Sequence, residues 1–183
     1  MGDRSMERLA RVLCDQGFDL VRFNFLYRES GLRRPDPMPR LKQCLEAVVA
    51  HARAELAIKR LIIGGRSMGG RAASMMAADG FACDGLLLLA YPLHPPGKPG
   101  QLRVAHLPKI RVPVLCINGM RDVLCTRELM DQALQTVRTR WDMHWLDGAD
   151  HSFRVLKSSG RTDTAIYAEA GDVCGRWLTE RLG

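Results

Sequence analysis

The segment from Leu61 to Gly70 carries the pattern best suited to chemistry, G-R-S-M-G around Ser67. The apolar run before Ser67 is typical of a buried parallel strand, and the alanine- and methionine-rich segment 71–78 after it is typical of a helix. A serine on so tight a turn is held in a strained backbone conformation that exposes its hydroxyl. We expect Gly65 and Gly69 to lie where strand and helix run too close for a side chain. The pattern predicts a nucleophile elbow, with the N–H groups and dipole of the following helix facing any oxyanion above the serine.

A serine nucleophile needs a general base, and an imidazole base needs a buried carboxylate that fixes its tautomer. His151 follows one predicted strand in D-G-A-D-H, and Asp122 follows another in N-G-M-R-D. Functional groups of open parallel sheets collect at the carboxyl ends of strands, so we expect both residues to meet Ser67 there. Asp122 could instead only start a loop with an Asx-turn, and Asp147 and Asp150 are competing acids. Asp150 adjoins His151 in sequence, which makes pairing with its ring awkward, and the order Ser, Asp, His is that of α/β hydrolases.

Strands and helices alternate along the chain that must position these side chains. The predicted strands are 19–25, 59–64, 85–90, 113–118 and 141–146, and the predicted helices are 5–16, 40–56, 71–78, 126–137 and 163–181. Two long loops, 26–39 and 91–109, separate them, and the prolines and arginines of 26–39 argue against helix or central strand. Alternation of this kind predicts an α/β fold, a three-layer, doubly wound and mostly parallel sheet of about five strands, in a single domain of residues 1–183.

The charge balance is basic, with 27 Lys and Arg against 20 Asp and Glu, a net charge of +7 and a pI near 9.4. Such a balance is compatible with an anionic partner, nucleic acid included. The arginines are nevertheless spread along the chain without the pattern of a known nucleic-acid-binding module, so no nucleic-acid partner is predicted.

Six cysteines lie singly in apolar or helical patterns, never as C-x-x-C, at 14, 44, 83, 116, 125 and 174. No signal peptide is recognisable, so we expect buried free thiols and a cytoplasmic location. No apolar run reaches the length needed to span a membrane, and no membrane partner is predicted.

Seven short motifs spread over the chain carry a family resemblance. They are R-F-N-F-L-Y at 22–27, R-R-P-D-P at 33–37, G-G-R-S-M-G-G-R at 64–71, Y-P-L-H-P-P-G-K-P at 91–99, L-R-x-x-H-L at 102–107, N-G-x-R-D at 118–122 and G-A-D-H-S-F at 148–153. With them the sequence resembles small bacterial α/β hydrolases of the dienelactone-hydrolase-like kind, related to the testis-expressed predicted hydrolases. The resemblance implies Ser67, Asp122 and His151 as a catalytic triad and the Met68 N–H as an oxyanion donor. The chain differs from true dienelactone hydrolases in having serine, not cysteine, as nucleophile.

One departure from this family concerns the start of the chain. Relatives begin with a central strand that ends in an H-G-x-G type loop, which supplies a second oxyanion N–H, whereas residues 1–4 resemble only the tail of that loop. We expect the loss of one donor to cost on the order of a hundredfold in rate. We also expect unpaired backbone on the strands 19–25 and 59–64, unless they close up or another chain, as in a homodimer, fills the slot.

Several loop residues are candidates for substrate contact. Basic side chains near the nucleophile or in the loop 91–109 could bind an anionic acyl or leaving group, namely Arg66, His94, Lys98, Arg103 and His106. Each could equally be a solvated loop charge. Cys125 is expected to be a buried thiol, and no metal site is predicted because no second ligand lies at usable spacing.

The sequence therefore predicts a carboxylesterase-like serine hydrolase that cleaves a small ester or related acyl compound through an acyl-enzyme, without a cofactor. Ser67 attacks, His151 transfers the proton, Asp122 orients His151, and Met68 holds the oxyanion. The alternative is a catalytically impaired α/β-hydrolase scaffold that serves protein interaction.

Overall fold

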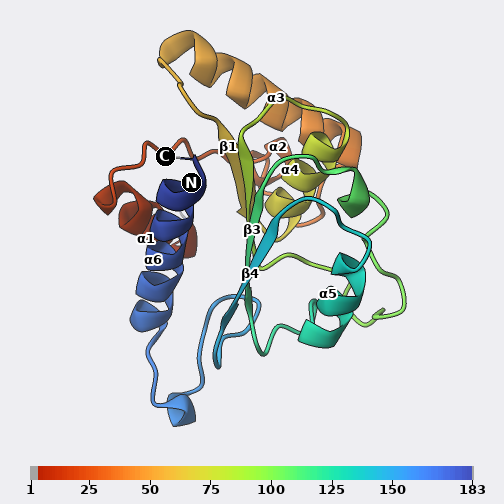
Figure 1. The fold of residues 1–183 in the computed structure, drawn as a ribbon, viewed down its shortest axis with the longest axis vertical. Helices are drawn as coiled ribbons and strands as arrows, with labels where there is room; N and C mark the ends of the chain where they lie inside the picture. Colours follow the sequence, from red (N-terminus) through yellow and green to blue (C-terminus); the bar gives the residue numbers. More distant parts are fainter. Residues whose placement is uncertain (1–3, 183) are drawn as a thin grey trace.

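The computed structural model describes residues 4–182, which form a parallel sheet between two layers of helices (Figure 1). The sheet has four strands in the order β1-β2-β3-β4, and every neighbouring pair is parallel. Their bounds are Ile62–Arg66, Gly85–Leu89, Val114–Gly119 and Trp141–Leu146. β2 and β3 are almost continuously apolar because both of their faces are covered.

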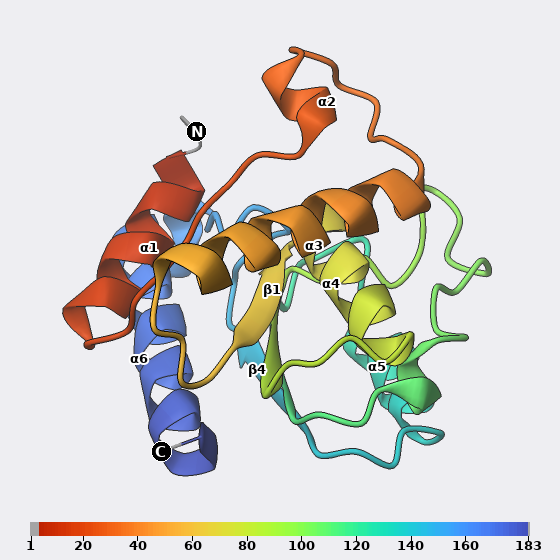
Figure 2. The ribbon, with the colours of Figure 1, turned by 90° about the horizontal axis from the view of Figure 1, so that it is seen from above.

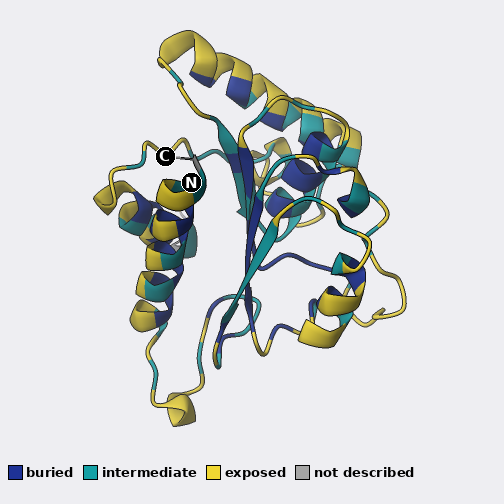
Figure 3. Ribbon diagram, viewed as in Figure 1, coloured by how far each residue is buried: buried dark blue, intermediate teal, exposed yellow. Residues whose placement is uncertain are grey.

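Helices cover both faces of this sheet, as a doubly wound fold requires (Figures 1 and 3). One face is covered by α1 and α6, which span Arg4–Asp15 and Asp163–Leu182. The other is covered by α3, α4 and α5, which span Met38–Glu55, Met68–Ala78 and Arg127–Leu134. Each helix layer has its own core, and the predicted three-layer α/β architecture is confirmed.

The first and last long helices pack unusually closely against each other. A Cβ atom added at Gly171 would lie 1.9 Å from Cγ1 of Val12, and one added at Gly175 would lie 1.7 Å from Oε1 of Gln16. These two glycines lie one turn apart on α6, so they leave room for α1 along a single stripe. Gln16 also donates to Asp172 over 3.0 Å, which ties the end of α1 to α6.

The predicted strand 19–25 is wrong. Its residues are extended, but they belong to no sheet, and among the described contacts none of their N–H groups from 19 to 24 finds a backbone acceptor. A strand exists only where a neighbouring backbone pairs with it, and within residues 4–182 no backbone pairs with this segment. The following loop also differs from expectation, because Leu26–Glu29 form one helical turn, α2, ahead of the prolines that exclude helix further on.

A cleft of about 2060 Å³ separates this extended segment from β1. Residues 17–25 and the inner face of α1 line one wall, and residues 56–69 with the buried stripe of α3 line the other. In Figure 2 the segment that joins α1 to α2 passes above α3 and does not join β1. The two predicted neighbours of a missing strand have therefore not closed up in this chain.

The remaining short elements are single 3₁₀ turns, η1 at Leu107–Lys109 and η2 at Lys157–Ser159. All six cysteines are free, yet only Cys116, Cys125 and Cys174 are buried, and Cys14 is exposed, contrary to the expectation of uniformly buried thiols. Burial raises the pKa of Cys174 to about 12. Between residues 4 and 182, none of the helices is long and apolar enough to cross a membrane.

Candidate active site

Ser67 occupies the turn between β1 and α4 in a conformation that side chains rarely adopt. Its φ is 51° and its ψ is −113°. The described non-glycine residues with positive φ are Ser67, Ala90 and Phe153, and all three follow carboxyl ends of strands. Such conformations cost about 1–3 kcal/mol each and persist only when the surrounding fold enforces them. The strain predicted for the elbow is therefore present, and it lies at the edge of the sheet where functional groups gather.

Two glycines allow α4 to start directly behind β1. A Cβ at Gly70 would lie 2.6 Å from the carbonyl oxygen of Gly65, and a Cβ at Gly65 would lie 3.0 Å from the carbonyl carbon of Gly69. The expectation for Gly69 is wrong, because its added Cβ would meet only the Phe25 ring, at 3.8 Å. The helix turns Gly70, not Gly69, toward the strand.

The structure brings Ser67, His151 and Asp122 together in one hydrogen-bonded row. Nε2 of His151 lies 2.9 Å from Oγ of Ser67, and Nδ1 of His151 lies 2.8 Å from Oδ2 of Asp122. The Asp122 side chain is completely buried, while His151 keeps partial exposure. A carboxylate accepts the Nδ1 proton, which leaves the Nε2 lone pair free to take the serine proton. This arrangement can generate a serine alkoxide and hold the imidazolium that results.

Asp122 is fixed in this row by further donors. Its Oδ1 accepts the N–H of Leu124 at 2.8 Å, and its Oδ2 also accepts Nδ2 of Asn118 at 3.3 Å. Asn118 is fully buried and exchanges two further hydrogen bonds with the backbone of Tyr91. Sequence reasoning named no role for Asn118, although it begins the N-G-x-R-D motif that contains Asp122. Its position at the end of β3 was the available signal.

The competing acids do not reach the imidazole. Oδ1 of Asp150 accepts the N–H groups of Ser152 and Arg154 at 2.7 and 3.0 Å, so this carboxylate shapes the loop that carries His151. Asp147 is exposed. Of the three candidate carboxylates, the structure places Asp122 on the histidine.

The basic residues predicted to contact substrate fall into two groups. Arg66 and Arg103 line the same cleft as Ser67 and His151. The guanidinium of Arg66 donates to the carbonyl oxygen of His151 at 3.0 Å and lies 5.8 Å from the ring centroid of Phe153, so it also braces the histidine loop.

The other three do not line the cleft. His94 is buried and shares a hydrogen bond with the Pro95 carbonyl, and Lys98 lies in the exposed turn after it. Nε2 of His106 lies 2.9 Å from Oγ of Ser74 and 3.4 Å from the Tyr91 hydroxyl. Burial, assisted by the charge of Arg71, lowers the pKa of His106 to about 4, so its imidazole is neutral at physiological pH.

Met68 is the first residue of α4, and its N–H lies at the helix end directly behind Ser67. The first N–H groups of a helix have no acceptor inside the helix, and the dipole adds positive potential there. This end of α4 can therefore stabilise an oxyanion that forms on Ser67. Within residues 4–182, no group of three or more His, Cys, Asp or Glu side chains is arranged to hold a metal ion.

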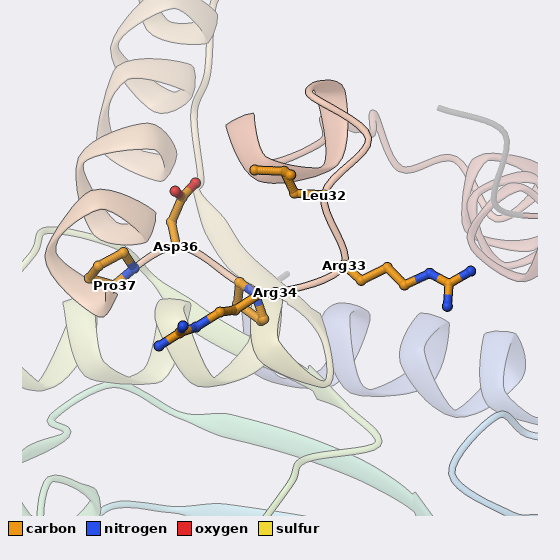
Figure 4. Close-up of a pocket in the computed structure, with 6 residues that line it drawn as sticks. Leu32, Arg33, Arg34, Asp36 and Pro37 are labelled. Carbon is orange, nitrogen blue, oxygen red and sulfur yellow. The ribbon is translucent and has the colours of Figure 1, made fainter.

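A second pocket of about 760 Å³ lies in the loop between α2 and α3 (Figure 4). It is lined by residues 32–37 alone, and the Arg33 and Arg34 side chains point in opposite directions. Asp36 is engaged with the Tyr27 N–H and with Arg40. A pocket made by a single exposed loop, with its acid already paired, offers no competing catalytic site.

Comparison with known proteins identifies the family and the fold of the chain. The family described as "Alpha/beta hydrolase domain" matches residues 1–179. An alpha-beta serine hydrolase homologue from Coxiella burnetii aligns with a TM-score of 0.76 and 20% identity over 97% of this chain and 77% of that one. A serine hydrolase without a lid from Xanthomonas campestris aligns with a TM-score of 0.73 and 22% identity over 97% of this chain and 75% of that one. Dienelactone hydrolase from Anabaena variabilis aligns with a TM-score of 0.69 and 18% identity over 98% of this chain and 80% of that one. The chain belongs to the α/β-hydrolase family.

Proposed function

We propose that this protein is a serine hydrolase that cleaves a small ester or related acyl compound through an acyl-enzyme. The observation that carries the proposal is the hydrogen-bonded row from Ser67 through His151 to Asp122. Each proton in the cycle has a place in this row, because His151 can accept at Nε2 while Nδ1 stays bonded to the carboxylate.

The reaction would proceed in two halves. Oγ of Ser67 attacks the acyl carbon and its proton passes to His151, which returns it to the departing alcohol oxygen as the ester C–O bond breaks. In the second half a water molecule gives its proton to His151 and attacks the acyl-enzyme, and the serine leaves with that proton. The Met68 N–H stabilises the oxyanion in both halves. The names of the structural neighbours, a serine hydrolase without a lid and a dienelactone hydrolase, support ester chemistry in a cleft that is open to small molecules.

Labelling with a fluorophosphonate probe tests this proposal. The wild-type protein should react at Ser67, the Ser67→Ala variant should not, and His151→Gln should react far more slowly because the serine loses its base. A protein that leaves the probe untouched, although its circular dichroism shows a folded chain, would contradict the proposal. Peptide mapping of the labelled residue excludes reaction at another serine.

The second candidate function is a non-catalytic scaffold for protein interaction. The open cleft beside β1 favours it, since in the described part of the chain β1 pairs on one side only, and relatives are expected to supply a second oxyanion donor from the other side. The probe separates the two functions, because a scaffold needs no activated serine. If labelling fails, retention of a binding partner by both the wild type and Ser67→Ala would favour the scaffold.

A further inference from the structure

Most of the charged side chains that line the cleft containing Ser67 are positive. Among the described lining residues Asp19 supplies the carboxylate, and the cationic side chains are Arg22, Arg28, Lys59, Arg60, Arg66, Arg103 and Arg154. The low-dielectric walls of a cleft focus the field of such charges, which raises the local concentration of anions. The overall charge of +7 is thus partly concentrated where a substrate would enter.

Two arginines near the nucleophile lack an acidic partner. Arg71 lies in the first turn of α4 and Arg103 lies in the loop 91–109, and neither forms an ion pair within the described chain. Nε of Arg71 is buried without a hydrogen-bond partner. A buried donor left unpaired costs about 1–3 kcal/mol, and such groups often mark the position of a ligand or ion.

The two arginines are close enough to affect each other. Burial lowers the pKa of Arg103, and the charge of Arg71 lowers it further. An anion placed beside this pair would relieve both the repulsion and the lost hydration.

A hydrogen-bond network joins the backbones of these arginines. The Ser74 hydroxyl donates to the Arg71 carbonyl at 2.9 Å, and the Tyr91 hydroxyl donates to the Arg103 carbonyl at 3.2 Å. The neutral imidazole of His106 lies between them, and its Nε2–H satisfies the Ser74 oxygen. If both hydroxyl protons go to these carbonyls, Nε2 is the protonated nitrogen. The network holds the loop of Arg103 against α4 without using either guanidinium.

We propose that the substrate carries an anionic oxygen group, a carboxylate or a phosphate, which Arg103 binds in the cleft while Arg71 stands behind it as a positioning residue. The inference rests on the proposed hydrolase function and adds the substrate class to it. Arg103 lines the same cleft as Ser67 and Met68, so the cation and the nucleophile face the same space. Charge-assisted bonds of guanidinium to carboxylate or phosphate are among the strongest that proteins form.

The kinetic test uses two 4-nitrophenyl esters that differ in one methyl group and one negative charge, mono-4-nitrophenyl glutarate and its methyl ester. The wild type should hydrolyse the anionic ester with a kcat/KM about tenfold to a hundredfold higher, as expected for one bond to a charged group. Arg103→Met should abolish that preference mainly through KM and leave the neutral ester within about threefold. Arg71→Met should reduce the preference for the anionic ester less than Arg103→Met does. Arg127→Gln, which removes one exposed positive charge on α5, is the control for net charge.

An equilibrium measurement keeps the test independent of turnover. Glutarate and inorganic phosphate should each be titrated calorimetrically into the Ser67→Ala protein, and the tighter ligand identifies the anionic group. Binding should weaken about tenfold or more in the Ser67→Ala/Arg103→Met double variant. Equal loss for both esters in Arg103→Met, or binding that is unchanged by the substitution, would overturn this inference. If the probe labels Ser67 but no anion preference is found, this inference fails alone. If the probe does not react and yet Arg103-dependent binding is measured, the proposed function fails instead.

Discussion

The two edge strands of the sheet are built in different ways. β4, W-D-M-H-W-L, alternates apolar and polar residues over its first five positions. Its polar residues bond to α6, with Trp177 donating to Asp142 at 2.8 Å and His144 bonding to Glu169 at 2.7 Å. β1, I-I-G-G-R, has no charge before its last residue. Charged side chains are a common protection of edge strands, whereas continuous apolar sequence is typical of interior parallel strands. β4 therefore has the composition of an edge strand, whereas β1 has the composition of an interior strand.

This difference divides the candidate site in two. The base and the acid follow β4 and β3, where the loops are held by a dense set of hydrogen bonds. The nucleophile follows β1, whose other side borders the cleft. The loops of the base and the acid are thus held by more hydrogen bonds than the strand of the nucleophile, which borders the cleft on one side. The following predictions test that contrast.

The largest effect should come from Asp122→Asn, which removes the carboxylate that bonds to His151. The amide oxygen should keep the Leu124 N–H, which turns the amide NH2 group toward Nδ1 of His151. Because this group donates, the imidazole carries its proton on Nε2, the wrong tautomer for Ser67, and kcat should fall about 10⁴-fold. Asp150→Asn is the matched control, because its amide oxygen can still accept the two loop N–H groups, and it should cost less than about tenfold. A retained activity above one tenth in Asp122→Asn would show that the row of three residues is not the proton relay.

The next effect concerns the elbow. Gly70→Ala places a Cβ 2.6 Å from the Gly65 carbonyl oxygen, which should push α4 away from β1 and lower the free energy of unfolding by about 1–3 kcal/mol. Gly69→Ala meets Phe25 only at ordinary contact distance and should be neutral or stabilising by up to about 1 kcal/mol, because alanine favours helix. Urea denaturation of both variants measures this. Equal destabilisation would mean that the orientation of α4 is wrong.

A smaller effect is expected from pH. The pKa of His106 is about 4 in the folded chain, below its ordinary 6.5, so the unfolded chain takes up the proton first. The stability from neutral His106 is complete above pH 6.5 and should decline as the pH falls toward 4. Thermal unfolding of His106→Gln should show a shallower decline than the wild type over that window. An equal decline of stability with pH in the two proteins would show that protonation of His106 is not linked to folding.

The smallest expected effect concerns the hydrogen exchange of the backbone amides of β1. The bond from the Ser67 N–H to the Leu89 carbonyl fixes the phase of the ladder, so the amides of Ile63 and Gly65 point to β2 and those of Ile62, Gly64 and Arg66 point to the cleft. Hydrogen exchange followed by NMR should show slow exchange for the first pair and fast exchange for the other three, without such alternation in β3. Uniform protection along β1 would mean that another strand occupies the cleft in solution.

The sequence predicted most of the fold because most elements carry their own signals. The four strands and five long helices appear near their predicted positions, since hydrophobic period and caps such as Thr126 are local properties. The failure at 19–25 is of another kind, because alternation predicts the capacity to pair but not the presence of a partner.

The candidate site was also partly predictable. Ser67, Asp122 and His151 follow strands, and parallel topology alone brings such positions together. The separation of Arg103 from His106 and His94 was not predictable, because which face of an irregular loop lines the cleft depends on its tertiary packing. Arg71 was missed for a related reason. It belongs to a helix pattern, and its buried unpaired Nε becomes visible only when every neighbour is placed.

The pairing of α1 with α6 has a consequence for synthesis on the ribosome. The contact between Gln16 and Asp172 joins residues 156 positions apart, so α1 is synthesised well before the helix that it packs against. At ordinary rates of translation, Leu9 and Leu13 of α1 remain uncovered for roughly 10–30 s before α6 emerges. During that interval the apolar face of α1 lacks the cover that α6 gives it in the folded chain.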